Sequence, residues 1–187
     1  MRTFVTAALL AVFVFAVPAS AADMASLQTN VRAALRSAKS FVVEVKIKPL
    51  PVAPMGASIQ WTVVAPNRFR QVTHGDPTGD DDTIIIGHNV YGNKNGAWDV
   101  QTWDDHLVTG FEADVFGVEI ISVNGDGTFV MKDPLGGSDR DTLSCAYDKS
   151  TYRPVTCSNA GKTVTYGRYD DPSVTIPAPA HAKRVDQ

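Results

Sequence analysis

The sequence is poor in cysteine, with two in 187 residues, and it contains no C-x-x-C pair. A structural zinc site or a dithiol redox centre needs further thiolates or a closely spaced pair, so neither is expected. Lys and Arg form no run, and 17 basic against 20 acidic residues leave a net charge of −3. The chain is therefore not expected to bind nucleic acid or an anionic membrane surface.

Signatures of nucleophilic catalysis are also missing. There is no G-x-S-x-G motif, and Ser144 falls in the middle of an expected strand instead of on a sharp turn. The histidines, at 74, 88, 106 and 181, are scattered over loops and the C-terminal tail without a local partner pattern for a general base. A glycosidase-like pair of carboxylates would be invisible in the sequence. No enzyme is expected, and a hydrolase with an unrecognised site is the third alternative.

Two segments invite a metal assignment. Asp80-Asp81-Asp82 lies near His74 and His88, but a charged run between hairpins is usually a solvated loop. Residues 122–133, SVNGDGTFVMKD, echo a calcium loop, yet the first position is Ser, the twelfth is Asp, and no helices flank it. Asn-Gly and Asp-Gly are better explained as turn residues. No metal and no cofactor are expected.

The N-terminus carries an export signal. Arg2 precedes an apolar run over residues 7–17, and Ala19-Ser20-Ala21 supplies a small-residue cleavage site. The run is short for a membrane span, which makes an uncleaved anchor the weaker alternative, and no cysteine near the cleavage point offers a lipid anchor. We expect a signal peptide over 1–21 and a soluble periplasmic or secreted protein.

The remaining chain predicts a mainly β domain with one or two helices. Residues 23–38 carry an apolar stripe at spacings of three and four, with Asp23 as the N-cap, and thus predict an amphipathic helix. Residues 41–48 alternate as a strand, and residues 57–103 predict a meander of short antiparallel strands joined by Gly- and Asn-rich turns. A second short helix is expected within 107–116, and further strands at 118–123, 128–132, 142–147, 155–159, 163–169 and 173–176.

The two cysteines are expected to form a disulfide. In a hairpin centred on Thr151, Cys145 and Cys157 stand directly opposite each other on adjacent strands. Export would place them in an oxidising compartment. We therefore expect this disulfide to stabilise the structure.

The order of these segments resembles the LolA-like family of periplasmic lipoprotein and lipid carriers. The resemblance rests on W-x-V-x-A-P-N-R-F-R at 61–70, I-I-I-G-x-x-V-Y at 84–91, the turn at 96–98, and the closing hairpins from Tyr147-Asp148 to Ile176-Pro177. It implies an incomplete antiparallel β-barrel with the N-terminal helix packed on its concave face. The family's lipoprotein carrier has an arginine before the motif's proline; Ala65 stands there in this chain, so that residue's role is not transferred.

The resemblance implies a carrier that shelters acyl chains of a lipid or lipid-modified ligand in an apolar cavity, without transforming them. We expect a half-barrel domain over 22–176, a flexible tail over 177–187, a monomer, and a membrane-bound donor or acceptor as a further partner. The alternative is a protein-interaction or sensing module with a filled core. The residues expected to line the cavity are Phe41, Val43, Val45, Trp61, Val63, Phe69, Ile84, Ile86, Trp98, Phe111 and Phe116.

Overall fold

The computed structural model describes residues 21–49, 56–75, 79–105, 116–135 and 141–185. The predicted signal peptide and the second predicted helix, with Phe111, fall almost wholly outside these ranges. The helix α1 spans Ala21–Ser37. The strands are β1 (Ser40–Ile47), β2 (Ala57–Val64), β3 (Arg68–His74), β4 (Asp81–Ile86), β5 (Asn89–Lys94), β6 (Ala97–Thr102), β7 (Ile120–Val123), β8 (Thr128–Lys132), β9 (Thr142–Tyr147), β10 (Pro154–Ser158), β11 (Lys162–Gly167) and β12 (Lys183–Arg184).

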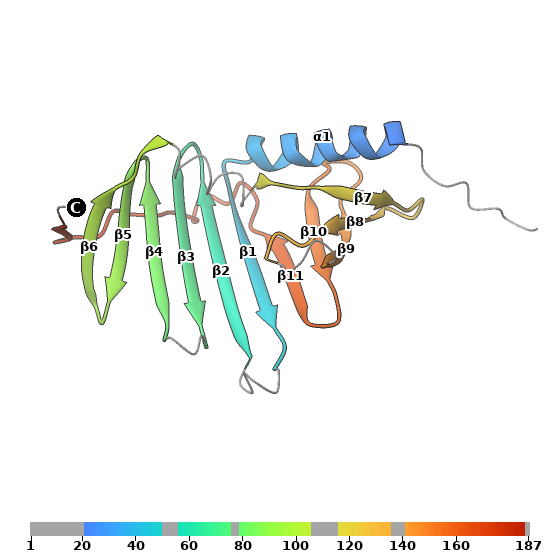
Figure 1. Ribbon diagram of the computed structural model, residues 1–187. Helices are drawn as coiled ribbons and strands as arrows, with labels where there is room; N and C mark the ends of the chain where they lie inside the picture. The colour runs from blue at the N-terminus through green and yellow to red at the C-terminus, as the bar shows by residue number, and fades with distance from the viewer. Residues whose placement is uncertain (1–20, 50–55, 76–78, 106–115, 136–140, 186–187) are drawn as a thin grey trace, which may run out of the picture.

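All the described strands belong to one open sheet, in the order β12-β6-β5-β4-β3-β2-β1-β11-β10-β9-β8-β7. Neighbouring strands are antiparallel except β12, which runs parallel to β6. The pairing of β1 with β11 joins the N-terminal meander to the C-terminal hairpins. Figure 1 shows the strands of the meander side by side, while β7 and β8 lie across their direction at the other end. The sheet curls without closing, which confirms the predicted half-barrel.

The helix covers one part of the concave face. Leu27, Val31 and Leu35 of its predicted stripe are buried and pack into the core. Two polar contacts fix its position: Arg32 Nε donates to the Val118 carbonyl at 2.9 Å, and Gln28 Oε1 accepts from the Ile120 N–H at 2.8 Å. Figure 1 accordingly shows α1 running alongside β7. Because the helix begins at Ala21, Asp23 lies in its first turn and is not the predicted N-cap.

The predicted disulfide is confirmed. Cys145 on β9 and Cys157 on β10 are directly opposite in register and are bonded to each other. Both side chains are buried on the concave side, where Cys145 also stands opposite Phe129 of β8. The disulfide therefore links β9 to β10 within the core cluster that also contains the buried side chains of α1.

Residues 170–185, which we call the strap, run back across the convex face (Figure 1). The Asp170 N–H donates to the Ser40 carbonyl at 2.8 Å, Arg68 Nη1 donates to the Ile176 carbonyl at 2.8 Å, and the Val185 N–H donates to the Val100 carbonyl at 3.0 Å. The strand predicted at 173–176 is wrong: Asp171 and Ser173 form a turn there instead. Part of the tail predicted from Pro177 onward forms β12.

The strap buries apolar side chains that the strands send to the convex face. Val42 and Ile84 have this orientation by alternation, and both are buried although they lie outside the main core cluster. Val174 and Ile176 of the strap are buried as well. We infer that these four side chains form a second, smaller apolar layer behind the sheet.

Removal of the disulfide is expected to lower the free energy of unfolding. Replacing both cysteines, Cys145→Ala with Cys157→Ala, should cost about 3 kcal/mol, because a cross-link that closes a loop of this length restricts the unfolded chain by that amount. Urea unfolding of the oxidised protein and the double variant measures the difference. The oxidised protein treated with a reductant serves as the matched sample, and equal midpoints in all three would contradict the prediction.

The strap is expected to contribute to stability through Ile176. Ile176→Ala should lower the free energy of unfolding by about 3 kcal/mol, in the usual range for truncation of a buried isoleucine. The neighbouring Thr175 is exposed, so Thr175→Ala should change it by less than about 0.5 kcal/mol. Urea unfolding of both variants tests this. Equal effects would show that the strap does not pack as described.

Candidate functional site: a cavity on the concave face

The pairing register arranges concave side chains in rows across the strands. One row runs Val63, Phe69, Ile85, Val90 and then Gln101, from β2 to β6. This row is apolar until its last member. It starts from Phe41 on β1, which stands opposite Val63. The concave face therefore continues its apolar surface from the core into the meander.

The next row along the strands becomes polar sooner. It runs Val43, Trp61, Gln71, Thr83, Gly92 and Asp99 from β1 to β6. Trp61 Nε1 donates to Gln71 Oε1 at 2.8 Å, which satisfies the polar atom of a half-buried ring. The face thus changes from apolar to polar both across the sheet and toward one end of the strands.

Beneath the helix the concave face is filled by the protein's own side chains. Phe41 is fully buried; its ring packs against Phe116, with centroids 6.1 Å apart, and against Tyr169 at 5.7 Å. Phe116 also contacts Phe69 at 6.1 Å. Among the described residues, these rings form part of the packed core.

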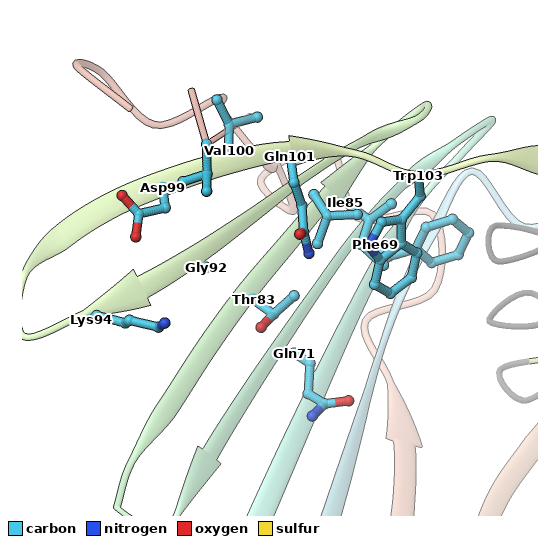
Figure 2. A pocket seen from close by; sticks show the side chains of 12 residues that line it. Phe69, Gln71, Thr83, Ile85, Gly92, Lys94, Asp99, Val100, Gln101 and Trp103 are labelled. Atoms are coloured by element: carbon cyan, nitrogen blue, oxygen red, sulfur yellow. The ribbon is translucent and has the colours of Figure 1, made fainter. Parts of the chain in front are cut away.

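The open part of the face holds a cavity of about 470 Å³, partly open to solvent. It lies over β3 to β6, beyond the reach of α1 (Figures 1 and 2). Figure 2 shows Phe69 and Trp103 close together at the end nearer the core, and Lys94 and Asp99 at the far end. The residues that line the cavity are Phe69, Gln71, Thr83, Ile85, Val90, Gly92, Lys94, Asp99, Val100, Gln101, Trp103 and Val185.

The structure places the candidates predicted to line a cavity in three groups. Phe69 lines the cavity and is also buried in the core cluster. Ile84, Ile86 and Trp98 alternate with concave residues and so face the convex side, while Phe111 lies outside the described residues. The rest belong to the packed core or its margin: Phe41, Val43, Val45, Trp61, Val63 and Phe116.

Several lining residues were missed by the sequence reasoning. Ile85 was passed over because three consecutive isoleucines at 84–86 do not show which of them face inward. The signal that could have identified it is the hairpin partner: Phe69 on β3 stands opposite Ile85. Val90 then follows from Ile85 across the next tight turn.

The two segments considered for a metal contain turns and a surface pair. Asp126 Oδ1 accepts hydrogen bonds from both the N–H and the hydroxyl of Thr128, and the hydroxyl bond is the main reason that the pKa of Asp126 is lowered. His74 Nδ1 lies 2.9 Å from an Asp80 oxygen on the surface. Within the described ranges no three His, Cys, Asp or Glu side chains are grouped so that they could hold a metal ion.

One buried carboxylate has a structural explanation. Asp133 Oδ2 makes no hydrogen bond of good geometry, but it lies 2.6 Å from Lys162 Nζ, and Asp133 Oδ1 accepts from the Leu135 N–H. The pKa of nearby Tyr166 is raised to about 12, mainly because its side chain is buried and secondly because of the negative charge of Asp133. The ion pair ties the loop after β8 to the start of β11.

Comparison with known proteins gives a likeness of fold. No protein-family model and no curated protein matches the sequence. Among solved structures, the Mycobacterium tuberculosis lipoprotein LppX aligns with a TM-score of 0.51 and 14% identity over 83% of this chain and 100% of its own. LprF from Mycobacterium bovis aligns with a TM-score of 0.50 and 16% identity over 87% and 98%. None of the helical segments described is long and apolar enough to cross a membrane.

Proposed function

Because the chain has the LolA-like half-barrel fold, as the sequence predicted, we propose that it is an exported carrier or binding protein for lipid or lipid-modified ligands. It holds an acyl chain in the cavity over β3 to β6 and does not transform it. A membrane-bound protein donates the ligand to the carrier or accepts it from the carrier. The carrier itself acts as a monomer in the periplasm or outside the cell.

The observation that carries this proposal is the cavity itself. Its volume of about 470 Å³ lies within the roughly 300–1,000 Å³ of small-molecule sites. Phe69, Ile85, Val90 and Trp103 give it an apolar inner end. Phe69, Ile85 and Val90 are themselves buried, so the inner end is an apolar recess of the kind in which small-molecule sites are built.

The energetics allow a reversible exchange. Burying roughly ten methylene groups from water contributes about 8 kcal/mol, at about 0.8 kcal/mol each. A lipid that comes from a membrane leaves an environment that is equally apolar, so only a small part of this free energy favours the carrier. Apolar contacts alone can therefore hold a chain in transit and release it at an acceptor.

A second candidate function follows from the filled half of the concave face. The packed rings beneath α1 fit a protein-interaction or sensing module, in which the half-barrel is only a scaffold. Native mass spectrometry of the protein purified from its own host separates the two candidates. A co-purifying acyl species supports the carrier, whereas a bare mass and no uptake of a fluorescent fatty acid support the module.

Filling the cavity is expected to block ligand binding. A Cβ added at Gly92 on β5 meets nothing within 4 Å, and the position lines the cavity, so Gly92→Leu places a side chain in the space that the ligand would occupy. We expect the affinity for a fluorescent fatty acid to fall about tenfold or more, which corresponds to about 1.4 kcal/mol. Fluorescence titration of the exported, processed protein measures it.

Gly167→Leu is the matched control. Gly167 ends β11, lies away from the cavity lining, and also has open space around an added Cβ. Its affinity for the probe should stay within about twofold of the unaltered protein, and both variants should keep the same thermal midpoint. Equal binding by Gly92→Leu and the unaltered protein would overturn this cavity as the ligand site.

A further inference from the structure

The cavity has two chemically different ends. The inner end is apolar, with Phe69 and Trp103 against the core. The outer end carries one cation, Lys94, and one anion, Asp99. Between them lie Gln71, Thr83 and Gln101, which are uncharged side chains able to donate or accept hydrogen bonds. A ligand that fits this lining is itself amphipathic.

The two charges at the outer end are close but separate. On β5 and β6 Gly92 is paired with Asp99, and Lys94 with Ala97, so Lys94 and Asp99 are diagonal neighbours on the same face. Diagonal neighbours are within reach of a long side chain such as lysine. Nevertheless, among the described residues neither forms an ion pair with the other or with a third group.

Gly92 keeps the space between the charges open. It lines the cavity, and no atom lies within 4 Å of the position that its Cβ would occupy. A side chain here would fill the area between Lys94 and Asp99. The backbone of Asp99 is also paired with Lys183 of β12, but the Lys183 side chain is not part of the cavity lining.

From this arrangement we propose that the ligand is a single-chain amphipath with a zwitterionic headgroup, a proposal that rests on the carrier function proposed above. The acyl chain lies toward Phe69 and Trp103. The linker lies over Gln71 and Gln101, whose amide groups hydrogen-bond its ester or hydroxyl oxygens. The anionic group of the head faces Lys94, and its cationic group faces Asp99.

The balance of charge distinguishes this class from simpler amphipaths. A fatty acid would bring its carboxylate to Lys94 but would also face the carboxylate of Asp99, and a cationic amphipath would have the reverse conflict. A zwitterion satisfies both, and each contact is a charge-assisted interaction at a partly exposed site. Such contacts select among ligands whose apolar burial is the same.

The test compares ligands that share a myristoyl-length chain and differ only in the headgroup. Myristic acid, monomyristoylglycerol, a myristyl trimethylammonium salt and myristoyl lysophosphatidylethanolamine each displace a fluorescent fatty acid from the exported protein, below their micelle-forming concentrations. We expect the lysophospholipid to bind about fivefold or more tightly than the monoglyceride, as two exposed charge contacts allow. The preference should shrink as salt is added.

Variants assign the preference to the two residues. Lys94→Gln and Asp99→Asn should each reduce the affinity for the lysophospholipid a few-fold and leave that for the monoglyceride within about twofold. Lys46→Gln, an exposed cation on the convex side of β1, is the matched control and should change neither affinity. The exchange of both charges, Lys94→Asp with Asp99→Lys, should retain part of the preference.

The possible outcomes distinguish failure of the headgroup proposal from failure of the carrier function on which it rests. Equal affinity for the monoglyceride and the lysophospholipid overturns the headgroup assignment and leaves the carrier in place. The headgroup assignment is also overturned if myristic acid binds most tightly and Asp99→Asn strengthens its binding further. That result would indicate an anionic headgroup that contacts Lys94 alone. Absence of binding of the fluorescent fatty acid itself to the folded protein overturns the carrier function.

Discussion

The packing of α1 against one end of the concave face is the interaction on which the rest of the structure depends. A curled sheet that does not close leaves its inner surface to be covered, and a helix of 17 residues covers only part of a sheet this wide. The stripe of Leu27, Val31 and Leu35 fills the part near β7 with side chains. What remains beyond it, over β3 to β6, is the cavity.

The sequence was informative wherever a local pattern decides the structure. Alternation and turn residues located most strands, and those predicted at 128–132 and 142–147 coincide with β8 and β9. The spacing of Cys145 and Cys157 about Thr151 identified their cross-strand pairing. These features depend on neighbours a few residues apart, which are all present in the local sequence.

Features that depend on distant segments were less predictable. Nothing near 173–176 indicates that this stretch lies behind strands from the first half of the chain, and its apolar alternation resembles a strand. Likewise, Phe41 and Phe69 are aromatic residues on strands of one face. Only the three-dimensional structure shows that both are buried in the core and that Phe69 also lines the cavity. A list of apolar residues cannot separate core from cavity lining without that information.

The two faces of the sheet differ in how their apolar side chains are covered. On the convex side the chain covers itself: the strap buries Ile176 and ends as β12 along β6, which occupies part of an edge that could otherwise pair with another chain. On the concave side, over the same strands, Phe69, Ile85 and Val90 are also buried, but a partly open cavity remains beside them. Val185, next to β12, lines the cavity at this edge, so the strap that completes the convex face also forms part of the cavity's wall. The proposed carrier function requires this difference between the faces, because only the surface that binds the ligand must become free again.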